Sequence, residues 1–240
     1  MTEESVNLLK SCSKSLGIIL SDEQTDLFSR YLFELMEWNK KFNLTAIKEE
    51  KEIVLKHFID SISAVPFFPK DASCMIDVGS GAGLPGIPIK IVLKDLAVTL
   101  LDSLEKRVNF LNHIIRYHSY ENTTAIHNRA EELAHAGKHR EAYDIGISRA
   151  VAPLSVLCEY VIPFVKIGGY FIAMKGSDIQ DELKASEKAV NVLGGSIEDV
   201  NNFLLPGTEI KRHLILIKKI RQTPTMYPRK SGKPSKSPLQ

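Results

Sequence analysis

Cysteine is scarce in this chain, and long apolar runs are missing from it. The three cysteines, Cys12, Cys74 and Cys158, stand far apart with no C-x-x-C pair, a pattern that provides neither a disulfide framework nor a zinc site. No apolar run approaches the length that crosses a bilayer, and the first residues are acidic where a signal peptide would be basic. We expect a cytoplasmic protein with no metal site and no membrane attachment, and we expect it to be a monomer.

Acidic residues are absent from the C-terminal end. Nine of the 31 Lys and Arg residues lie from Lys211 onward, so residues 1–210 hold 22 basic against all 29 acidic side chains, a balance of −7. The net charge of +2 hides this asymmetry. Positive charge concentrated at one end suggests a partner with a phosphate backbone. A solvated tail that only aids solubility is the alternative.

The sequence of residues 1–66 predicts helices. Ser21 and Gln24 form a capping-box pattern, and apolar residues follow it at helical spacing as far as Phe42. A second helix is predicted over residues 53–62 and ends before Pro66. We expect an all-helical cap ahead of the remaining domain.

From Cys74 onward, apolar runs of strand length alternate with helical patterns. The predicted strands are 74–78, 97–101, 123–127, 143–148 and 169–174, and the predicted helices are 88–95, 104–118, 129–137, 153–163 and 178–193. This alternation predicts an α/β fold, a mostly parallel sheet with helices on both faces. Two further runs, 197–205 and 212–219, predict an antiparallel terminal hairpin. We divide the chain into a helical cap (1–66), an α/β domain (67–220) and a basic tail (221–240).

A glycine-rich turn follows the first predicted strand. Gly79, Gly81 and Gly83 allow a sharp turn and remove side chains that would keep a bound adenosine from the backbone. The second predicted strand ends in Asp102, at about the separation at which a carboxylate reaches a pair of ribose hydroxyls. Together the turn and the acid indicate an adenosyl cofactor.

Two cofactors fit such a turn, NAD and S-adenosylmethionine (SAM). Gly81, Gly83 and Gly86 satisfy the dinucleotide pattern G-x-G-x-x-G. In that fold, however, the first glycine follows the strand at once and the helix N-terminus faces a pyrophosphate, whereas here the set starts three residues late. A carboxylate at Asp77 suits an ammonium and a sulfonium and would repel a diphosphate. The pattern favours SAM, although Asp77 is also able to anchor the turn by accepting backbone N–H groups.

An ordered set of short motifs extends over nearly the whole chain. The motifs are Trp38-Asn39, Asn43-Leu44-Thr45-Ala46, His57-x-x-Asp60-Ser61, the turn from Asp77 to Pro88, Leu101-Asp102-Ser103, Lys106-Arg107, Arg129-Ala130-Glu131, Ser148-Arg149-Ala150-Val151-Ala152-Pro153-Leu154, Thr223-Pro224 and Tyr227-Pro228-Arg229. With these motifs the sequence resembles the glucose-inhibited division protein B (RsmG) family, bacterial class I SAM-dependent methyltransferases with a Rossmann-like sheet that methylate N7 of one guanine in 16S ribosomal RNA.

The resemblance implies a set of cofactor-binding residues. Arg149 ends the fourth predicted strand and would pair with the SAM carboxylate, or else with a neighbouring acid. Glu131 would edge the adenine, or else simply favour the first turn of a helix. The resemblance implies SAM contacts from Gly79, Leu84, Ala130, Glu131 and Arg149. With the residues of the glycine turn and of the second predicted strand, the expected SAM contacts are Asp77, Gly79, Gly81, Leu84, Asp102, Ser103, Ala130, Glu131 and Arg149.

Guanine N7 carries a free lone pair at neutral pH, so the expected reaction needs no general base and we nominate no catalytic residue. We expect His57 to be a core or capping residue. The expected partner is 16S ribosomal RNA, the small ribosomal subunit or its precursor, and truncation after Lys219 is expected to abolish RNA methylation and to leave SAM affinity intact. The expected RNA contacts are Arg212, Lys218, Arg221, Tyr227, Arg229 and Lys230.

Two other functions remain open at the level of the sequence. A glycine turn of this kind also occurs in NAD(P)-linked oxidoreductases. A non-catalytic RNA-binding protein that senses SAM would keep the same pocket and the same basic end. Binding of labelled SAM against NADH distinguishes the first alternative, and methyl transfer to RNA distinguishes the second.

Overall fold

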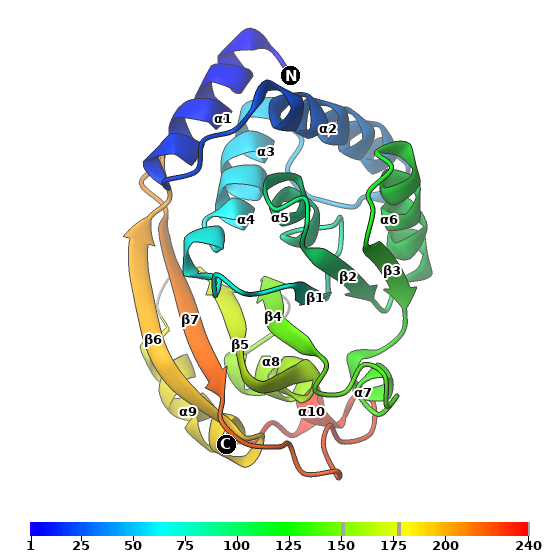
Figure 1. The fold of residues 1–240 in the computed structure, drawn as a ribbon, viewed down its shortest axis with the longest axis vertical. Helices are drawn as coiled ribbons and strands as arrows, with labels where there is room; N and C mark the ends of the chain where they lie inside the picture. The colour runs from blue at the N-terminus through cyan, green and yellow to red at the C-terminus, as the bar shows by residue number, and fades with distance from the viewer. Residues whose placement is uncertain (150–151, 177–178, 240) are drawn as a thin grey trace.

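The computed structural model describes residues 1–149, 152–176 and 179–239, and in these stretches seven strands form one sheet (Figure 1). The strand order is β3-β2-β1-β4-β5-β7-β6. β1 to β5 run parallel, whereas β7 is antiparallel to both β5 and β6. The strands are β1 (Cys74–Val78), β2 (Ala97–Asp102), β3 (Thr123–His127), β4 (Tyr143–Arg149), β5 (Val165–Lys175), β6 (Gly195–Leu204) and β7 (Lys211–Lys219). The predicted α/β sheet with a terminal hairpin is confirmed.

Helices cover both faces of the sheet. One hydrophobic cluster joins the sheet to the N-terminal helices, α5 and α6, and a second joins the opposite face to α7, α8 and α9. Two single turns of 3-10 helix, Val65–Phe67 and Ile162–Phe164, lead into β1 and β5. The α-helices are α1 (Glu3–Ser15), α2 (Asp22–Phe42), α3 (Glu50–Ile53), α4 (Asp60–Ile62), α5 (Gly86–Val92), α6 (Glu105–Tyr117), α7 (Ala130–Leu133), α8 (Leu154–Val161), α9 (Gln180–Val192) and α10 (Lys233–Lys236).

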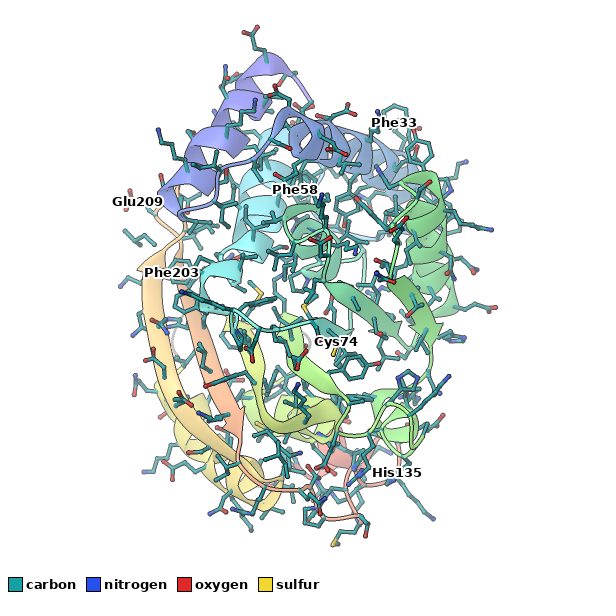
Figure 2. All side chains as sticks on the ribbon, in the orientation of Figure 1. Phe33, Phe58, Cys74, His135, Phe203 and Glu209 are labelled. Atoms are coloured by element: carbon teal, nitrogen blue, oxygen red, sulfur yellow. The ribbon has the colours of Figure 1, made fainter. Side chains whose placement is uncertain are left out.

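The N-terminal helices share one core with the sheet. Ser21 caps α2 in the predicted capping box with Gln24. Phe58, labelled in Figure 2, is fully buried and packs against the rings of Phe28 and Tyr31. The predicted helix over 53–62 is instead α3, a π-helical stretch (Val54–Ile59) and α4 in succession. The helical cap therefore continues the core of the α/β domain.

The reversal of strand order places a site at one edge of the sheet. β1 lies in the centre with β2 and β3 on one side and β4 and β5 on the other. Ligands of open α/β sheets bind outside the carboxyl ends of the strands at such a switch point. The residues after Val78 converge there with Asp102 and Arg149, the last residues of β2 and β4, because the three strands are parallel and in register.

Several element bounds differ from the prediction. α7 ends at Leu133, four residues before the predicted end at 137. β5 begins at Val165, four residues before the predicted start at 169. The predicted start of a helix at Asp178 and the Ala150-Val151 pair of a family motif lie outside the described residues. Within the described stretches no helix is both long and apolar enough to cross a membrane.

The C-terminal residues return across the body of the protein. After β7 the chain runs beside α9, α8 and α7, and it forms the short helix α10 next to α8 (Figure 1). Thr223, Pro228 and Pro234 are buried in this contact. The tail predicted to be a separate segment thus packs on the second face of the sheet.

Candidate functional site

A cavity of about 480 Å³ opens at the carboxyl ends of β1, β2 and β4. This volume is in the usual range for sites that enclose a small molecule or cofactor. The lining residues come from the glycine turn, the ends of β2 and β4, the segment after β3, and the N-terminal region. They are Leu44, Thr45, His57, Val78, Gly79, Ser80, Gly81, Ala82, Leu84, Leu101, Asp102, Ser103, Arg107, Asn128, Arg129, Ala130, Glu131, Arg149 and Tyr160.

The glycine turn forms the floor of this cavity. Gly79, Gly81 and Gly83 have φ angles of 80°, 59° and 88°, a region that residues with a Cβ rarely adopt. The backbone N–H groups of Gly79 and Ser80 donate to the carbonyl of Leu101 at 2.8 and 3.0 Å. The turn is therefore fastened to the end of β2 through its own backbone.

Asp102 links the turn to the next element. Its Oδ2 accepts from the Gly81 N–H at 2.8 Å, and its Oδ1 accepts from the Leu104 N–H at 2.9 Å. Arg107 lies 3.4 Å from Oδ2. An ionised carboxylate has about four acceptor positions, so Asp102 retains capacity for a ribose hydroxyl. The carboxylate belongs to the cavity wall, where the sequence predicted it.

Asp77 lies beneath the turn, outside the cavity lining that the described residues define. Its side chain is fully buried, and Oδ2 accepts from the Gly86 N–H at 2.9 Å. Burial raises the pKa of this carboxyl to about 7. Among the described residues Oδ1 has no hydrogen-bond partner. The geometry favours the anchoring role that the sequence left open over the predicted contact with SAM.

Ala130 and Glu131 line the cavity on the side of β3, together with Asn128 and Arg129. The Glu131 side chain is buried, and its Oε1 accepts from the Gly232 N–H at 2.9 Å. The wall on this side therefore involves the C-terminal segment.

Arg149 lines the opposite side and already has a partner. Its Nη1 lies 3.0 Å from the Asp60 carboxylate and also donates to the carbonyl of Lys56 at 3.2 Å. Arg212 shares the same carboxylate, with Nε 2.7 Å from Asp60 Oδ1. The alternative in which Arg149 pairs with a neighbouring acid is thus realised, while the side chain remains in the cavity wall.

His57 and Thr45 complete this side of the cavity. Thr45 Oγ1 lies 2.7 Å from His57 Nε2. Burial, and next the nearby charge of Arg149, lower the pKa of His57 to about 4. The imidazole is therefore neutral at physiological pH.

Sequence reasoning predicted no cofactor role for several residues that line the cavity. Thr45 and His57 belong to quoted family motifs, and those motifs were the available signal. Asn128 directly precedes another motif, and Arg107 lies within one. No sequence pattern indicated that Tyr160 lines the cavity, because its position depends on how α8 packs.

The predicted RNA contacts differ in how freely they are exposed. Arg212 pairs with Asp60, Lys218 with Glu198, and Arg229 with the fully buried Glu159. Arg221 donates to Asn191, and Tyr227 packs against the hydrophobic cluster on the second face. Lys230 is exposed. Arg229 is thus held within the protein, whereas the sequence suggested a free phosphate contact.

No group of three or more His, Cys, Asp or Glu side chains in the described part of the chain is placed to hold a metal ion.

The fold, together with the family match and the curated relatives, defines a class I SAM-dependent methyltransferase, with a sheet of parallel strands closed by an antiparallel seventh strand and a glycine turn beside an acid at the end of β2. More narrowly, the chain belongs to the family of rRNA small subunit methyltransferase G, whose model matches residues 24–215. The predicted family is confirmed, and the alternative of an NAD(P)-linked oxidoreductase is set aside.

Two relatives show how similar this chain is to other members of the family. Ribosomal RNA small subunit methyltransferase G of Acetivibrio thermocellus is 55% identical over 97% of this chain and 96% of its own length. The protein of the same name from Desulforamulus reducens is 50% identical over 96% of this chain and 97% of its own length.

Solved structures show the same fold at low sequence identity. The chain is similar to M. jannaschii TYW2 in complex with AdoMet, with a TM-score of 0.53 at 13% identity over 68% of this chain and 76% of that one. It is equally similar to geranyl diphosphate C-methyltransferase of Streptomyces coelicolor, with a TM-score of 0.53 at 12% identity over 79% and 98%.

Proposed function

We propose that this enzyme transfers the methyl group of SAM to N7 of one guanine in 16S ribosomal RNA, within the small ribosomal subunit or its precursor. The observation that carries the proposal is the cavity at the ends of β1, β2 and β4 in a chain of this family. The relatives are named as methyltransferases of small-subunit ribosomal RNA. The choice of guanine N7 rests on the ordered motifs that the chain has in common with the family.

The cavity residues fit SAM in three respects. The positive φ angles at Gly79 and Gly81 leave the backbone open to close approach. Asp102 would accept from the ribose hydroxyls, and Ala130 and Glu131 would lie along the adenine. The Asp102 carboxylate also favours a cationic ligand over a diphosphate. When bound, SAM supplies a methyl group made electrophilic by its sulfonium.

The acceptor base would enter on the side of β4. Because β3 and β4 lie on opposite sides of β1 and β2, Glu131 and Arg149 mark opposite ends of the cavity. Leu84 and Gly79 lie between them on the glycine turn. We propose that Arg149 faces the amino-acid end of SAM, and that Thr45 and His57 border the incoming guanine.

The reaction depends on the position of the guanine relative to the methyl group and not on proton transfer. Guanine N7 attacks through a lone pair in the plane of the base, so no proton has to leave before the bond forms. Positive charge passes onto the guanine during this step, and the neutral His57 adds none beside it. Rate acceleration then comes from holding N7 in line with the methyl carbon and excluding water.

The basic end would contact RNA phosphates. Lys230, Lys233 and Lys236 are exposed and follow one another along the C-terminal segment, and counterion release from phosphate would favour their binding. Arg212, Lys218 and Arg221 lie on β7 and just beyond it, and Tyr227 and Arg229 follow on the same segment. We propose that the exposed lysines of the C-terminal segment receive the RNA, that Arg212 and Lys218 act from β7, and that the protein works as a cytoplasmic monomer.

Methyl transfer from labelled SAM to RNA tests the proposal. The substrates are naked 16S ribosomal RNA and small subunits from cells that lack this gene, compared with material from unaltered cells. We expect incorporation only in RNA from the deletion cells, where the site is unmodified. Binding of labelled SAM without incorporation into either substrate would support the non-catalytic alternative and would refute the proposal.

A further inference from the structure

The C-terminal segment after β7 is anchored by backbone contacts that are independent of its positive charge. The Arg140 guanidinium donates to the carbonyls of Thr223 and Tyr227 at 2.9 Å each. His135, labelled in Figure 2 beside this segment, lies 2.8 Å from the carbonyl of Pro228. Hydrogen bonds from a charged donor are stronger than neutral ones. These contacts hold the segment in one path along α7.

A buried ion pair fixes the middle of the segment. The Arg229 side chain is 15% exposed and the Glu159 side chain 0% exposed, with Nη2 2.6 Å from Oε2. The backbone N–H of Arg229 also donates to Glu159 Oε1 at 2.7 Å. Hydrogen bonding to Glu159 raises the pKa of the Arg229 guanidinium, so Arg229 remains charged. Glu159 belongs to α8 and is followed directly by Tyr160, which lines the cavity.

Beyond Arg229 the segment reaches the cavity wall itself. The Gly232 N–H donates to Glu131 Oε1 at 2.9 Å, and the short helix α10 packs against α8, the helix that carries Tyr160. Glu131 and Tyr160 both line the cavity. Gly232 has a φ of 79°, a conformation that suits glycine and turns the chain toward Glu131.

We infer that residues 229–236 are a cofactor-positioning clasp that holds Glu131 and Tyr160 in the wall of the SAM site. Without the clasp, the Glu131 carboxylate loses the backbone donor that fixes it, and the wall loses its set position. Docking of the segment and binding of SAM then stabilise each other to the same extent. The inference rests on the proposed SAM site and reverses the expectation that truncation leaves SAM affinity intact.

Two variants distinguish the effect of the clasp contacts on SAM binding from the effect of the positive charge of the segment. The first ends after Arg229 and keeps the ion pair with Glu159 while lacking Gly232 and Ser235. The second is the full chain with Lys233→Ala and Lys236→Ala, two exposed side chains on α10. Isothermal titration with SAM alone gives the dissociation constant of each, independently of any RNA substrate.

We expect about tenfold weaker SAM binding for the shortened chain, the effect of losing one hydrogen bond to a charged group. We expect no change for the doubly substituted chain. Equal SAM affinity of the shortened and full-length chains would overturn the inference. An equal loss in both variants would also contradict it, since the effect would then arise from charge.

Hydrogen exchange of the intact protein gives a second measurement that does not depend on a variant folding. The peptide spanning residues 229–236 is followed with and without saturating SAM. We expect slower amide exchange in this peptide when SAM is present. Unchanged exchange there would refute the coupling, while SAM binding and RNA methylation measured on the same sample would still report on the proposed function.

Discussion

The carboxylate of Asp102 both fastens the glycine turn and faces the cofactor cavity. Its Oδ2 accepts from the Gly81 N–H. We expect Asp102→Asn to weaken SAM binding by roughly 10- to 100-fold, since a hydrogen bond to a charged group contributes about 1.5–3 kcal/mol. Titration calorimetry measures the change. Asp181→Asn, at an exposed position on α9, is the matched control and should bind SAM like the unaltered protein.

Asp77 should respond differently because its carboxyl is buried below the turn. We expect Asp77→Asn to keep SAM affinity within about threefold, roughly the effect of 0.6 kcal/mol. If Asp77→Asn weakened SAM binding as much as Asp102→Asn does, the result would instead support a direct contact between Asp77 and SAM.

The stability of the Asp77 variant should also depend on pH in a defined direction. Burial raises the folded pKa of Asp77 from 3.8 to about 7, so the folded state favours the protonated carboxyl and the unaltered protein loses stability as pH rises from 3.8 to 7. The asparagine cannot ionise. Urea unfolding at several pH values should show the free-energy difference moving in favour of the variant up to pH 7 and then levelling.

His57 offers a test of the chemistry at the same scale. Its pKa of about 4 keeps the ring neutral above pH 5, and N7 attack needs no base. We expect the single-turnover rate constant for RNA methylation to be the same at every pH between 6 and 8. A decline below pH 6 with the slope of one titrating group on the enzyme would indicate that a protein base takes part.

Among the helices, α5 begins at Gly86, where the end of the glycine turn packs closely against β1 and β2. A Cβ at Gly86 would overlap the Leu100 side chain and come within 2.9 Å of Asp77 Oδ2. We expect Gly86→Ala to lower the free energy of unfolding by about 1–3 kcal/mol through overpacking. Gly137→Ala has no atom within 4 Å of the added carbon and should stay within about 0.5 kcal/mol. Urea unfolding of the two variants compares them.

Equal unfolding free energies for Gly86→Ala and Gly137→Ala would show that the start of α5 tolerates a side chain. The described contact with β1 and β2 would then not be the reason for a glycine at position 86.

Strand positions followed from local patterns wherever an apolar run had turn residues at both ends. β1 and β3 match the predicted bounds for this reason. β5 begins earlier than predicted because the strand continues through Gly169, where a Cβ would lie 2.5 Å from the Asp144 carbonyl oxygen. A glycine that looks like a strand boundary in the sequence here marks the close approach of β4.

Elements held by distant partners were not predictable in the same way. The π-helical stretch Val54–Ile59 has Arg149 donating to the carbonyls of Lys56 and His57, a contact that no local pattern shows. The C-terminal segment owes its path to Arg140 and Glu159 in the same manner. Composition correctly showed a basic end, and it gave no sign that this end is folded.

The candidate site was predictable to the extent that strand ends define it. Asp102, Ser103 and Arg149 end β2 and β4 or follow them directly, so parallel topology brings them to one edge. Asp77 is the exception, because it lies within β1 and its side chain points into the core. Which acid of the motif faces the cavity depends on packing below the turn.

At the scale of the whole molecule, three parts of the chain build one cavity. The N-terminal region contributes Thr45 and His57, the sheet contributes the glycine turn and Asp102, and the C-terminal segment contacts the wall at Glu131. The basic residues from Lys211 onward lie on β7 and on this same segment. An RNA that engages the basic residues of this segment would therefore meet the protein next to this cavity.

We propose that this cavity holds SAM while its methyl group passes to one guanine N7 in 16S ribosomal RNA. Chemical cleavage at N7-methylguanine, mapped by primer extension, tests it directly on RNA from cells that lack the gene, before and after incubation with the purified protein and SAM. We expect one new cleavage site, which should be absent when the Asp102→Asn variant is used at a limiting SAM concentration. Incubation that leaves the cleavage pattern unchanged, or that marks a base other than guanine, would contradict it.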